Sequence, residues 1–538
     1  MRYTQHHNKR RTAQDRPIPG RIMVANAAGG FDFAVNDWTR LHRFLILGSE
    51  GGTYYVGEPI LTRDNAQAVE RCVAADGPRV LRELLAVSEG GRAPKNDPAL
   101  FVLALCASAA DEGTRREALA LLPRIARIGT HLFTFVTYLK DLRGRGKLAH
   151  RALQRWYTER ELAELELQLA KYQGRAQAGE RWTHRDVLRL ARPRVEGDRN
   201  QALAWAVGKP ADLTALPLLA GVEAVKAAKT ADEVVALIDS ARLPRECVPT
   251  QWLNDPAVWL ALLPTMPPMA LLRNLGKLAS LGLFDGPAEG PAYDCLRRRF
   301  ARESLVRARL HPLSILMGLR QFAEGHGDRG KLRWPVAPKV VALLNAAFHD
   351  AFEAVEPTGQ RLLLAVDCSA SMDGERIAGT ALTAREAAGA LTLVTSATEP
   401  SCQVVGFTAG RSTGLYCESG LVPLDISVHR RLDDVLRVMR EVPFGGTDCA
   451  LPMLYAAEQG LKVDAFVILT DNETWAGDVH PTQALADYRR QTGIAAKLAV
   501  LAMTSTGYSI ADPADAGQMD MVGFDTATPT VLADFLRG

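Results

Sequence analysis

The fold of this 538-residue chain is decided by the stretch Leu362-Leu363-Leu364-Ala365-Val366-Asp367-Cys368-Ser369-Ala370-Ser371-Met372. Its first five residues form a short apolar run, which is typical of a strand buried on both faces of a parallel sheet. An acid and two serines at alternate positions follow, where the strand is expected to open into a loop. Open α/β sheets bind ligands at this end of their strands. The oxygens of Asp367, Ser369 and Ser371 therefore predict a site for a hard cation.

The rest of residues 361–538 alternates between short apolar runs and amphipathic segments of helical spacing. Strands are predicted at Leu362–Val366, Cys402–Phe407, Ala465–Thr470, Leu498–Met503 and Met521–Phe524. Helices are predicted at Glu375–Ala397, Arg430–Glu441, Ala450–Gln459, Thr482–Gln491 and Val531–Arg537. This alternation indicates βαβ units, which build a parallel sheet with helices on both faces.

Two further loops of this part contain oxygen ligands. Thr447 follows the pair Gly445-Gly446, and Asp471 stands at the end of the apolar run Phe466–Leu469. Hydroxyl and carboxylate oxygens suit Mg²⁺ or Mn²⁺. We therefore predict a divalent cation held by a set of five side chains, Asp367, Ser369, Ser371, Thr447 and Asp471. An open position would accept an acidic residue or a phosphate of another molecule. The alternative is a buried strand whose serines bind nothing.

The order of these three pieces resembles the metal-ion-dependent adhesion site of von Willebrand factor A domains. The resemblance implies a Rossmann-like domain that binds a partner through its ion. A phosphatase of the haloacid-dehalogenase type would need an acid at position 369, where this chain has a serine. Cys368 and Cys449 lack an evident histidine that would activate them as nucleophiles. We predict a binding domain and not an enzyme.

Residues before position 360 have a different pattern. Asp37–Gly48 is predicted to be a short helix after an extended segment, and Gly51–Val56 a strand-like piece. From about residue 63 to 349 apolar residues recur at helical spacing, in segments that include Leu148–Gln173 and Ala292–Arg309. No fixed repeat length is present. We expect an irregular helical-repeat solenoid, with a generic helical bundle as the alternative.

Charge divides the chain in the same place. Residues 361–538 contain 13 Lys and Arg against 22 Asp and Glu, a net charge of −9, whereas residues 1–360 contain 51 against 39, a net charge of +12. A polyanion is the natural partner of the basic part. The chain has no apolar run long enough to cross a membrane, its first residues do not resemble a secretory signal, and its eight cysteines are scattered. We expect a cytoplasmic protein with reduced thiols.

Basic residues of the first part gather beside aromatic ones. Lys140, Arg143 and Arg151 precede Trp156 and Tyr157. A second cluster extends over residues 171–194, and a third over 297–309. Cations contact phosphates and aromatic rings stack on bases, as recognition of single-stranded RNA requires. These clusters favour RNA binding, although each taken alone is also typical of a solvated helix face, with its tryptophan in the core.

Over nearly its whole length the chain resembles the Ro ribonucleoprotein family, whose members contain a TROVE module, and it is similar to the bacterial members. The stretches that carry the resemblance are Asp37–Gly48, Glu50–Tyr55, Thr130–Phe135, Gly445–Met453 and Thr470–Thr474. The resemblance implies that residues 1–360 form a TROVE module, which is a ring of HEAT-like helical repeats that binds RNA. Residues 361–538 would be the von Willebrand factor A-like domain with its metal-ion-dependent adhesion site.

The family's activity is then an expectation for this chain. The resemblance implies that small noncoding Y RNA binds a basic outer surface and that single-stranded ends of misfolded RNA pass through the ring. It also implies a role in noncoding RNA quality control, with bacterial members acting beside a 3′ exoribonuclease. Lys171 and Arg175 match a Lys-Tyr-x-x-Arg element that contacts RNA in the family, and Trp182, His184 and Asp186 match the Trp-x-His-x-Asp that follows it. The RNA-binding residues so expected, together with the basic clusters, are Lys140, Arg143, Lys171, Arg175, His184, Arg185, Arg189 and Arg192.

Two other functions remain open at this stage. The chain could be a protein-binding assembly scaffold that holds an acidic residue of its partner at the metal site, without RNA. A metal-dependent hydrolase is the third hypothesis, against which stands the lack of an evident base or nucleophile.

Overall fold

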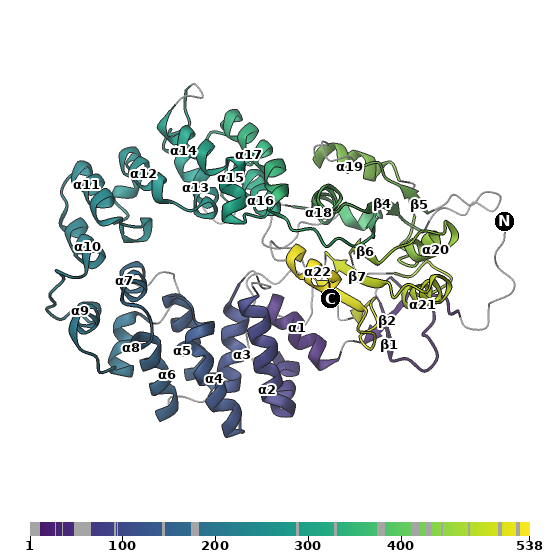
Figure 1. Cartoon of the computed structure of the whole chain (residues 1–538), viewed down its shortest axis with the longest axis horizontal. Coiled ribbons are helices and arrows are strands. Elements are labelled where there is room, and N and C mark those ends of the chain that lie inside the picture. Colours follow the sequence, from purple (N-terminus) through teal and green to yellow (C-terminus); the bar gives the residue numbers. More distant parts are fainter. Residues whose placement is uncertain are drawn as a thin grey trace. The chain divides into compact units, whose positions relative to one another are not determined.

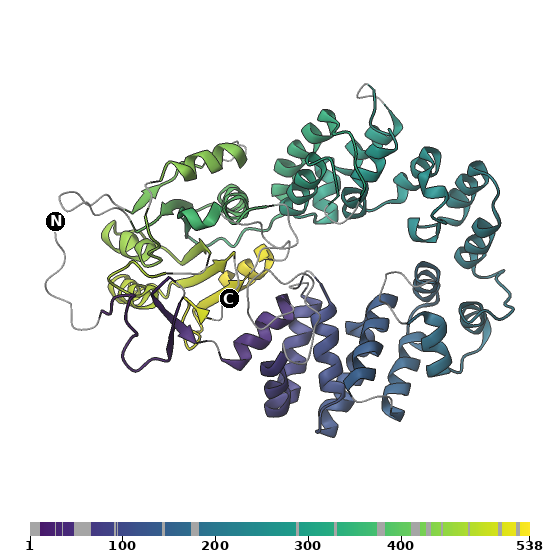
Figure 2. The same ribbon diagram turned by 180° about the vertical axis from the view of Figure 1, so that it is seen from behind.

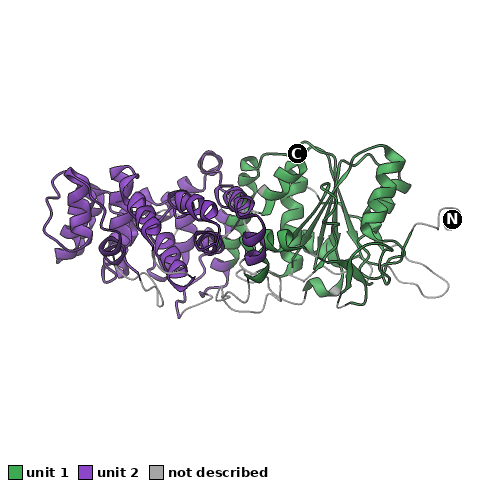
Figure 3. Cartoon of the chain, turned by 90° about the horizontal axis from the view of Figure 1, so that it is seen from below, with its two compact units in different colours: residues 1–68, 311–320, 348–538 green, residues 69–310, 321–347 purple. Residues whose placement is uncertain are grey.

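The computed structural model describes most of the chain, and all structural statements below concern these residues: 11–26, 28–34, 36–47, 66–90, 93, 95–142, 146–173, 182–286, 290–327, 331–373, 382–409, 420–426, 432–442, 445–471, 474–503, 508–522 and 528–537. They fall into two compact units (Figure 3). One consists of residues 1–68, 311–320 and 348–538, and the other of residues 69–310 and 321–347. The predicted strand-like piece at Gly51–Val56 lies outside the described residues.

The second unit is built from helices that follow one another along the chain (Figure 1). They are α2 (Gln67–Glu89), α3 (Asp97–Ala107), α4 (Glu112–Ile125), α5 (Gly129–Leu142), α6 (Lys147–Thr158), α7 (Leu162–Lys171), α8 (His184–Ala191), α9 (Gly197–Ala206), α10 (Pro217–Ala227), α11 (Ala231–Ala241), α12 (Pro256–Leu262), α13 (Pro268–Ser280), α14 (Pro291–Arg299) and α15 (Arg302–Ala308). By sequence position, α16 (Pro312–Ala323) and α17 (Pro338–Asp350) are divided between the two units.

Contacts in the first half of this unit join helices two places apart as well as neighbours. Helix α3 packs against α5, α4 against α6, α6 against α8, and α7 against α9. Stacking of alternate helices is the arrangement of a two-layered solenoid, in which each repeat contacts only its neighbours. The series can be followed from behind in Figure 2. The predicted helical-repeat solenoid is therefore confirmed, and the generic bundle is not.

Two predicted helices are each divided in two. The segment predicted at Leu148–Gln173 breaks between α6 and α7, and the one at Ala292–Arg309 breaks between α14 and α15. The second break leaves Phe300 buried, 3% exposed, between the two short helices. Apolar spacing continues across both breaks because the helices on either side bury residues in one core, so periodicity alone did not reveal the turns.

The first unit contains a six-stranded sheet in the order β5-β4-β3-β6-β7-β9. Its strands are β3 (Leu362–Asp367), β4 (Cys402–Phe407), β5 (Leu421–Pro423), β6 (Ala465–Thr470), β7 (Lys497–Ala502) and β9 (Gln518–Val522). All pairs are parallel except that of β4 with the edge strand β5. The predicted parallel α/β sheet is confirmed. Strand β5 was not predicted, and β9 begins three residues before the predicted Met521.

Helices cover both faces of this sheet (Figure 3). Side chains of α20 (Leu451–Glu458) and α21 (Pro481–Thr492) form a core with alternate strand residues such as Leu363 and Ala365. Helix α18 (Ala384–Thr398) contacts β3, β4 and β6, and α19 (Leu432–Arg440) packs on α18. Helix α22 (Thr528–Arg537) closes the described chain. Because both faces are buried, every residue of β3 and β6 is buried, which explains their continuous apolar sequence.

The first described residues of the chain belong to this same unit. Strands β1 (Met23–Ala25) and β2 (Phe31–Ala34) form a small antiparallel sheet with β8 (Tyr508–Ser509). Helix α1 (Asp37–Leu47), as predicted from its amphipathic pattern, follows directly. We call residues 11–26 and 28–34 the N-terminal strap. Although residues 1–360 are expected to form one family module, the strap is thus packed with residues of the C-terminal sheet.

Within the described residues, no helix is both long enough and apolar enough to cross a membrane.

Candidate metal site and nucleic-acid interface

The end of β3 presents a buried carboxylate. Asp367 is fully buried, and its two oxygens are held by different groups. The backbone N–H of Ser369 donates to Oδ1 at 2.8 Å, and the hydroxyl of Thr470 donates to Oδ2 at 2.8 Å. Thr470 is the last residue of β6, which pairs with β3. The sheet therefore brings the two strand ends together and fixes the orientation of Asp367.

The two predicted serines lie on the turn after β3. Their hydroxyl oxygens are 3.0 Å apart, within hydrogen-bond distance. Ser369 is 4% exposed, whereas Ser371 is exposed to solvent. The turn thus keeps Ser369 inside and Ser371 at the surface, with their hydroxyl groups in contact.

The loops of Thr447 and Asp471 are fastened to each other. The carbonyl oxygen of Thr447 accepts hydrogen bonds from the backbone N–H groups of Trp475 and Ala476, both at 3.2 Å. Asp471 directly follows Thr470 and is half-buried. Burial, and secondly the charge of Asp471, raise the pKa of Asp367 to about 7. The structure therefore brings the end of β3 and the Asp471 loop together, and it joins the Thr447 loop to the latter.

The donor chemistry of this set fits a hard divalent cation. Burial and the charge of Asp471 disfavour the ionised form of Asp367, which a bound cation would stabilise, and hydroxyl oxygens complete the ligands that Mg²⁺ or Mn²⁺ prefers. The described residues contain no group of three His, Cys, Asp or Glu side chains placed to hold a metal. A cation here would consequently depend on the hydroxyls of Ser369, Ser371 and Thr447.

Two neighbouring residues were not found from the sequence. Arg385, on the first turn of α18, is 3% exposed and donates from its guanidinium to the carbonyl of Ser369 at 2.9 Å and to Asp373 at 2.8 Å. It supports the serine turn from beneath. Trp475 is 42% exposed, and its indole lies against Gly446, where an added Cβ would approach it to 2.7 Å. The aromatic ring is therefore available to a partner beside the Thr447 loop.

The predicted RNA-binding residues of α8 divide into two kinds. Arg185 and Arg189 are four positions apart, so they share one face of the helix, and both are exposed. Neither forms an ion pair within the described part of the chain. Arg192 is exposed at the end of the helix, in a left-handed backbone conformation with φ 47°. These three guanidinium groups are available to an anion.

His184 has a different environment. It is 2% exposed, and its ring lies against Phe133 and Trp156, with ring centroids 4.9 Å and 5.6 Å away. Its Nδ1 is 2.9 Å from the hydroxyl of Tyr157. Burial lowers its pKa to about 3, so the ring is neutral at pH 7. The expected RNA contact of His184 is corrected accordingly, because a neutral, enclosed ring has no surface to offer.

The aromatic residues expected beside the basic cluster are also internal. Trp156 and Tyr157 are fully buried, and the indole N–H of Trp156 donates to the carbonyl of Ala126 at 2.5 Å. They cannot stack on bases, so the core interpretation holds for both. Their role is to fix α8 against α5 and α6, which determines where Arg185 and Arg189 point. Helix α8 begins with a capping box between Thr183 and Asp186, which sets its start.

The remaining predicted RNA contacts lie on other elements. Lys140, in the last turn of α5, is exposed. Lys171 ends α7 and is half-buried, with its ammonium 4.0 Å from a carboxylate oxygen of Glu246. Arg143 and Arg175 lie outside the described residues.

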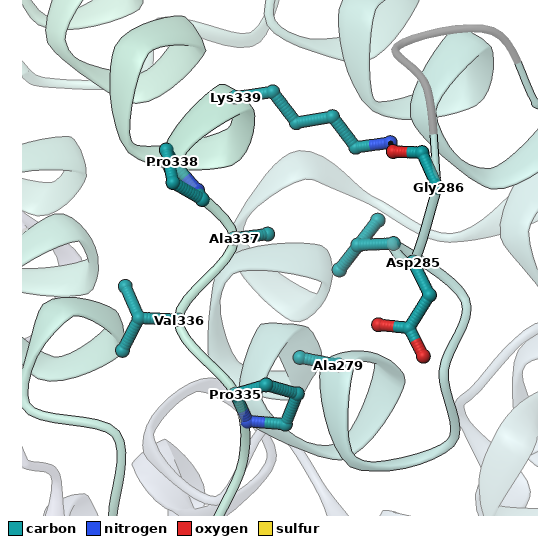
Figure 4. A pocket seen from close by; sticks show the side chains of 9 residues that line it. Ala279, Asp285, Gly286, Pro335, Val336, Ala337, Pro338 and Lys339 are labelled. Carbon is teal, nitrogen blue, oxygen red and sulfur yellow. Dashed lines mark hydrogen bonds between the residues drawn. The ribbon is translucent and has the colours of Figure 1, made fainter.

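A separate cavity of about 460 Å³ lies within the helical unit (Figure 4). Apolar residues such as Phe284 and Val336 line much of it, and Lys339 donates to the carbonyl of Gly286 at 3.0 Å on one side. No predicted site residue lines this cavity. This cavity is therefore separate from the candidate metal site and from the basic residues of α8.

Comparison with known proteins assigns both parts of the chain. Residues 24–238 and 241–321 match the model of the TROVE domain, and residues 361–536 match that of the Ro60 vWA domain. The chain is 39% identical to RNA-binding protein RO60 of Deinococcus radiodurans over 96% of both chains. It is 34% identical to RNA-binding protein RO60 of Caenorhabditis elegans, over 96% of this chain and 90% of the relative.

A solved structure agrees with these matches. The crystal structure of the Deinococcus radiodurans RO (RSR) protein superimposes with a TM-score of 0.78 at 39% sequence identity. The likeness covers 94% of this chain and 100% of the other.

Proposed function

Because the chain belongs to the family of TROVE-domain proteins with an Ro60-type von Willebrand A domain, we propose that it binds RNA. The observation that carries this proposal is the pair Arg185 and Arg189, two exposed guanidinium groups on one face of α8 without an acidic partner in the described structure. Such groups bind phosphate with two parallel hydrogen bonds and remain charged at all relevant pH values. Two relatives that match this chain over nearly its whole length are named RNA-binding proteins.

We further propose small noncoding Y RNA as the ligand of this basic surface, with misfolded RNA bound through its single-stranded ends. The chain would then act in noncoding RNA quality control, as an adaptor for a 3′ exoribonuclease. Support comes from the family and from the arrangement of charge. Phosphates can be contacted from α5, α7 and α8, where Lys140, Lys171, Arg185, Arg189 and Arg192 lie. Arg143 and Arg175 complete the proposed set.

The metal site would give the first unit, which contains the six-stranded sheet, its own partner. We propose that Asp367, Ser369, Ser371, Thr447 and Asp471 hold Mg²⁺ or Mn²⁺. When bound, the cation would supply a positive charge that accepts a carboxylate from an acidic residue of another protein. The exposed ring of Trp475 lies beside the Thr447 loop. It would pack against apolar side chains of the partner protein, next to the partner's acidic residue.

Binding without catalysis accounts for the side chains around this site. Burial raises the pKa of the Cys368 thiol to about 12, and it raises that of Cys449 well above its ordinary value. A thiol of this kind is protonated at pH 7 and is a poor nucleophile. The described cysteines are free thiols, and we propose a cytoplasmic location, where such thiols would stay reduced.

A protein-binding scaffold that does not bind RNA is the second candidate function. The observation that favours it is the convergence of oxygen ligands at the ends of β3 and β6, far in sequence from the basic helices. The ultraviolet absorption spectrum of the freshly purified chain separates the two functions. Nucleic acid in the purified sample supports the RNA-binding function. A spectrum of protein alone, together with failure of the chain to bind added RNA, supports the protein-binding scaffold.

A charge reversal tests the RNA proposal directly. The double variant Arg185→Glu with Arg189→Glu is compared with Arg437→Glu, which changes an exposed arginine on α19, within the acidic residues 361–538. The ligand is a structured RNA with a single-stranded 3′ tail, and binding is measured by fluorescence anisotropy. We expect the α8 variant to lose roughly tenfold or more in affinity, because phosphate contacts are replaced by repulsion. Unchanged affinity, or an equal loss in Arg437→Glu, would exclude this face.

A further inference from the structure

Gln14 of the N-terminal strap is fully buried within the first unit, among residues of positions 448–479. Its amide nitrogen donates to Oδ1 of Asp448 at 2.8 Å and to the carbonyl of Val479 at 2.9 Å. Its amide oxygen accepts from the hydroxyl of Thr474 at 2.7 Å and from the backbone N–H of Gly477 at 3.2 Å. All four hydrogen-bonding positions of the amide are therefore engaged.

The identity of the side chain follows from these partners. A carboxylate and a carbonyl only accept hydrogen bonds, whereas a backbone N–H only donates. A side chain that meets acceptors with one end and donors with the other must be an amide, and its orientation is fixed. The backbone of Gln14 is held as well, since its N–H donates to the carbonyl of Gly477 and its carbonyl accepts from Phe31, both at 2.9 Å.

Two of the groups that Gln14 contacts belong to the metal-site loops. Asp448 follows Thr447, and Thr474 is three residues after Asp471. The hydroxyl of Thr474 also accepts from the backbone N–H of Cys449 at 3.1 Å, which joins the loops again. The side chain of Gln14 thus joins the segment that presents Thr447 to the segment that presents Asp471.

We propose that Gln14 is a positioning residue for the divalent-cation site, holding the loops of Thr447 and Asp471 at the spacing that the ion requires. This inference rests on the proposed cation site and adds a component from a segment more than 300 residues away in sequence. Neutral hydroxyls bind a cation weakly, so their positions must be set before the ion arrives. Groups that hold the ligands of a metal change its affinity by roughly 10–100-fold when they are removed.

The test uses the full chain and Mn²⁺ alone. Gln14→Met keeps the length of the side chain and removes all four hydrogen bonds. The matched control is Gln483→Met on α21, because the side-chain oxygen of Gln483 accepts from the backbone N–H of Thr12 at 2.9 Å. That control removes a glutamine hydrogen bond between the strap and α21, and it leaves the loops of Thr447 and Asp471 unchanged. Mn²⁺ affinity is measured by calorimetry, together with the thermal stabilisation that Mn²⁺ produces.

The expected result is an affinity roughly 10–100-fold lower in Gln14→Met, with Gln483→Met close to wild type. The melting curve without metal shows whether the variant is folded. If Gln14→Met does not fold, Gln14→Asn takes its place, because it is one methylene too short to reach both loops.

Each other outcome overturns the inference in a recognisable way. Wild-type affinity in a folded Gln14 variant excludes the positioning role and leaves the cation site intact. Equal losses in the Gln14 and Gln483 variants show a general loosening of the strap. A wild-type chain that takes up no Mn²⁺ removes the cation site and the inference together.

Discussion

The hydroxyl of Thr470 donates a 2.8 Å hydrogen bond to Oδ2 of Asp367 and so joins the ends of two adjacent parallel strands. With the N–H of Ser369 on Oδ1, each oxygen of this fully buried carboxylate is already oriented by one hydrogen bond. A carboxylate oxygen can accept more than one bond, so both retain capacity for a cation. The strand register, and not the loop alone, therefore prepares the site.

Removal of that hydroxyl should be costly. We expect Thr470→Val to lower the free energy of unfolding by about 1–3 kcal/mol, because a buried carboxylate loses a hydrogen bond that nothing replaces. The control is Thr392→Val on α18, also fully buried, whose hydroxyl donates only to the carbonyl of Ala388 in its own helix. Urea unfolding measures both. Equal losses would show that the Thr470–Asp367 bond has no special weight.

Acid should weaken the aromatic cluster around His184. Burial lowers the pKa of its ring to about 3, and the charge of Arg160 acts in the same direction. The unfolded chain, with a pKa near 6.5, takes up a proton that the folded chain refuses. The contribution to stability is therefore complete above about pH 6.5 and is lost as the pH falls towards 3. Between pH 7 and pH 5 the loss is about 2 kcal/mol for this histidine.

The variant His184→Phe isolates that contribution. His131 and His311, whose pKa values burial lowers to about 4, remain and still destabilise the chain in acid. The difference in unfolding free energy between pH 7 and pH 5 should nevertheless shrink by about 2 kcal/mol relative to wild type. An unchanged pH dependence would mean that the ring of His184 is already accessible to protons.

The place of helix α1 in the sheet unit can be tested through a buried ion pair. The guanidinium of Arg43 is 2.8 Å from Asp520 of β9, and the two side chains are 4% and 3% exposed. Arg43→Ala should cost about 3 kcal/mol, because it leaves a buried acid without its partner. Breaking a buried ion pair in this way costs roughly 3–5 kcal/mol. Because burial raises the pKa of Asp520, the carboxyl left without Arg43 can take up a proton, and we expect the loss of stability to lie near the lower end of that range.

A double variant serves as the control for this pair. Arg43→Met combined with Asp520→Leu replaces both charges by apolar groups and should recover most of the stability that the single variant loses. Thermal unfolding of all three chains provides the comparison. A single variant as stable as wild type would argue against this packing of α1.

Most of the C-terminal fold could be predicted from the sequence because burial on both faces makes strands β3 and β6 continuously apolar. Their ends, Asp367 and Asp471, were recognisable for the same reason. The contribution of Gln14 could not be predicted, since a polar residue in a segment without periodicity looks solvated. Only the folded chain shows that it meets partners more than 400 positions away.

The basic helices show the opposite limit. Charge composition predicts RNA binding by the basic part of the chain, but it does not distinguish a residue on the outer face of α8 from one on its inner face. Arg185 and His184 are neighbours in sequence, yet one is exposed and the other is enclosed by Trp156 and Phe133. A helix of eight residues turns through about two full turns, so its orientation depends on packing that the local sequence does not record.

RNA affinity as a function of salt tests the central claim most directly. Contacts with phosphates release counterions, so the logarithm of the affinity should fall linearly with that of the salt concentration, by about 0.7–0.9 for each contact. For the wild-type chain and a structured RNA with a single-stranded tail, we predict a slope of several units. Arg185→Glu with Arg189→Glu should reduce it by about 1–2 units. A slope near zero, or the same slope in both chains, would contradict the proposal that this surface binds RNA.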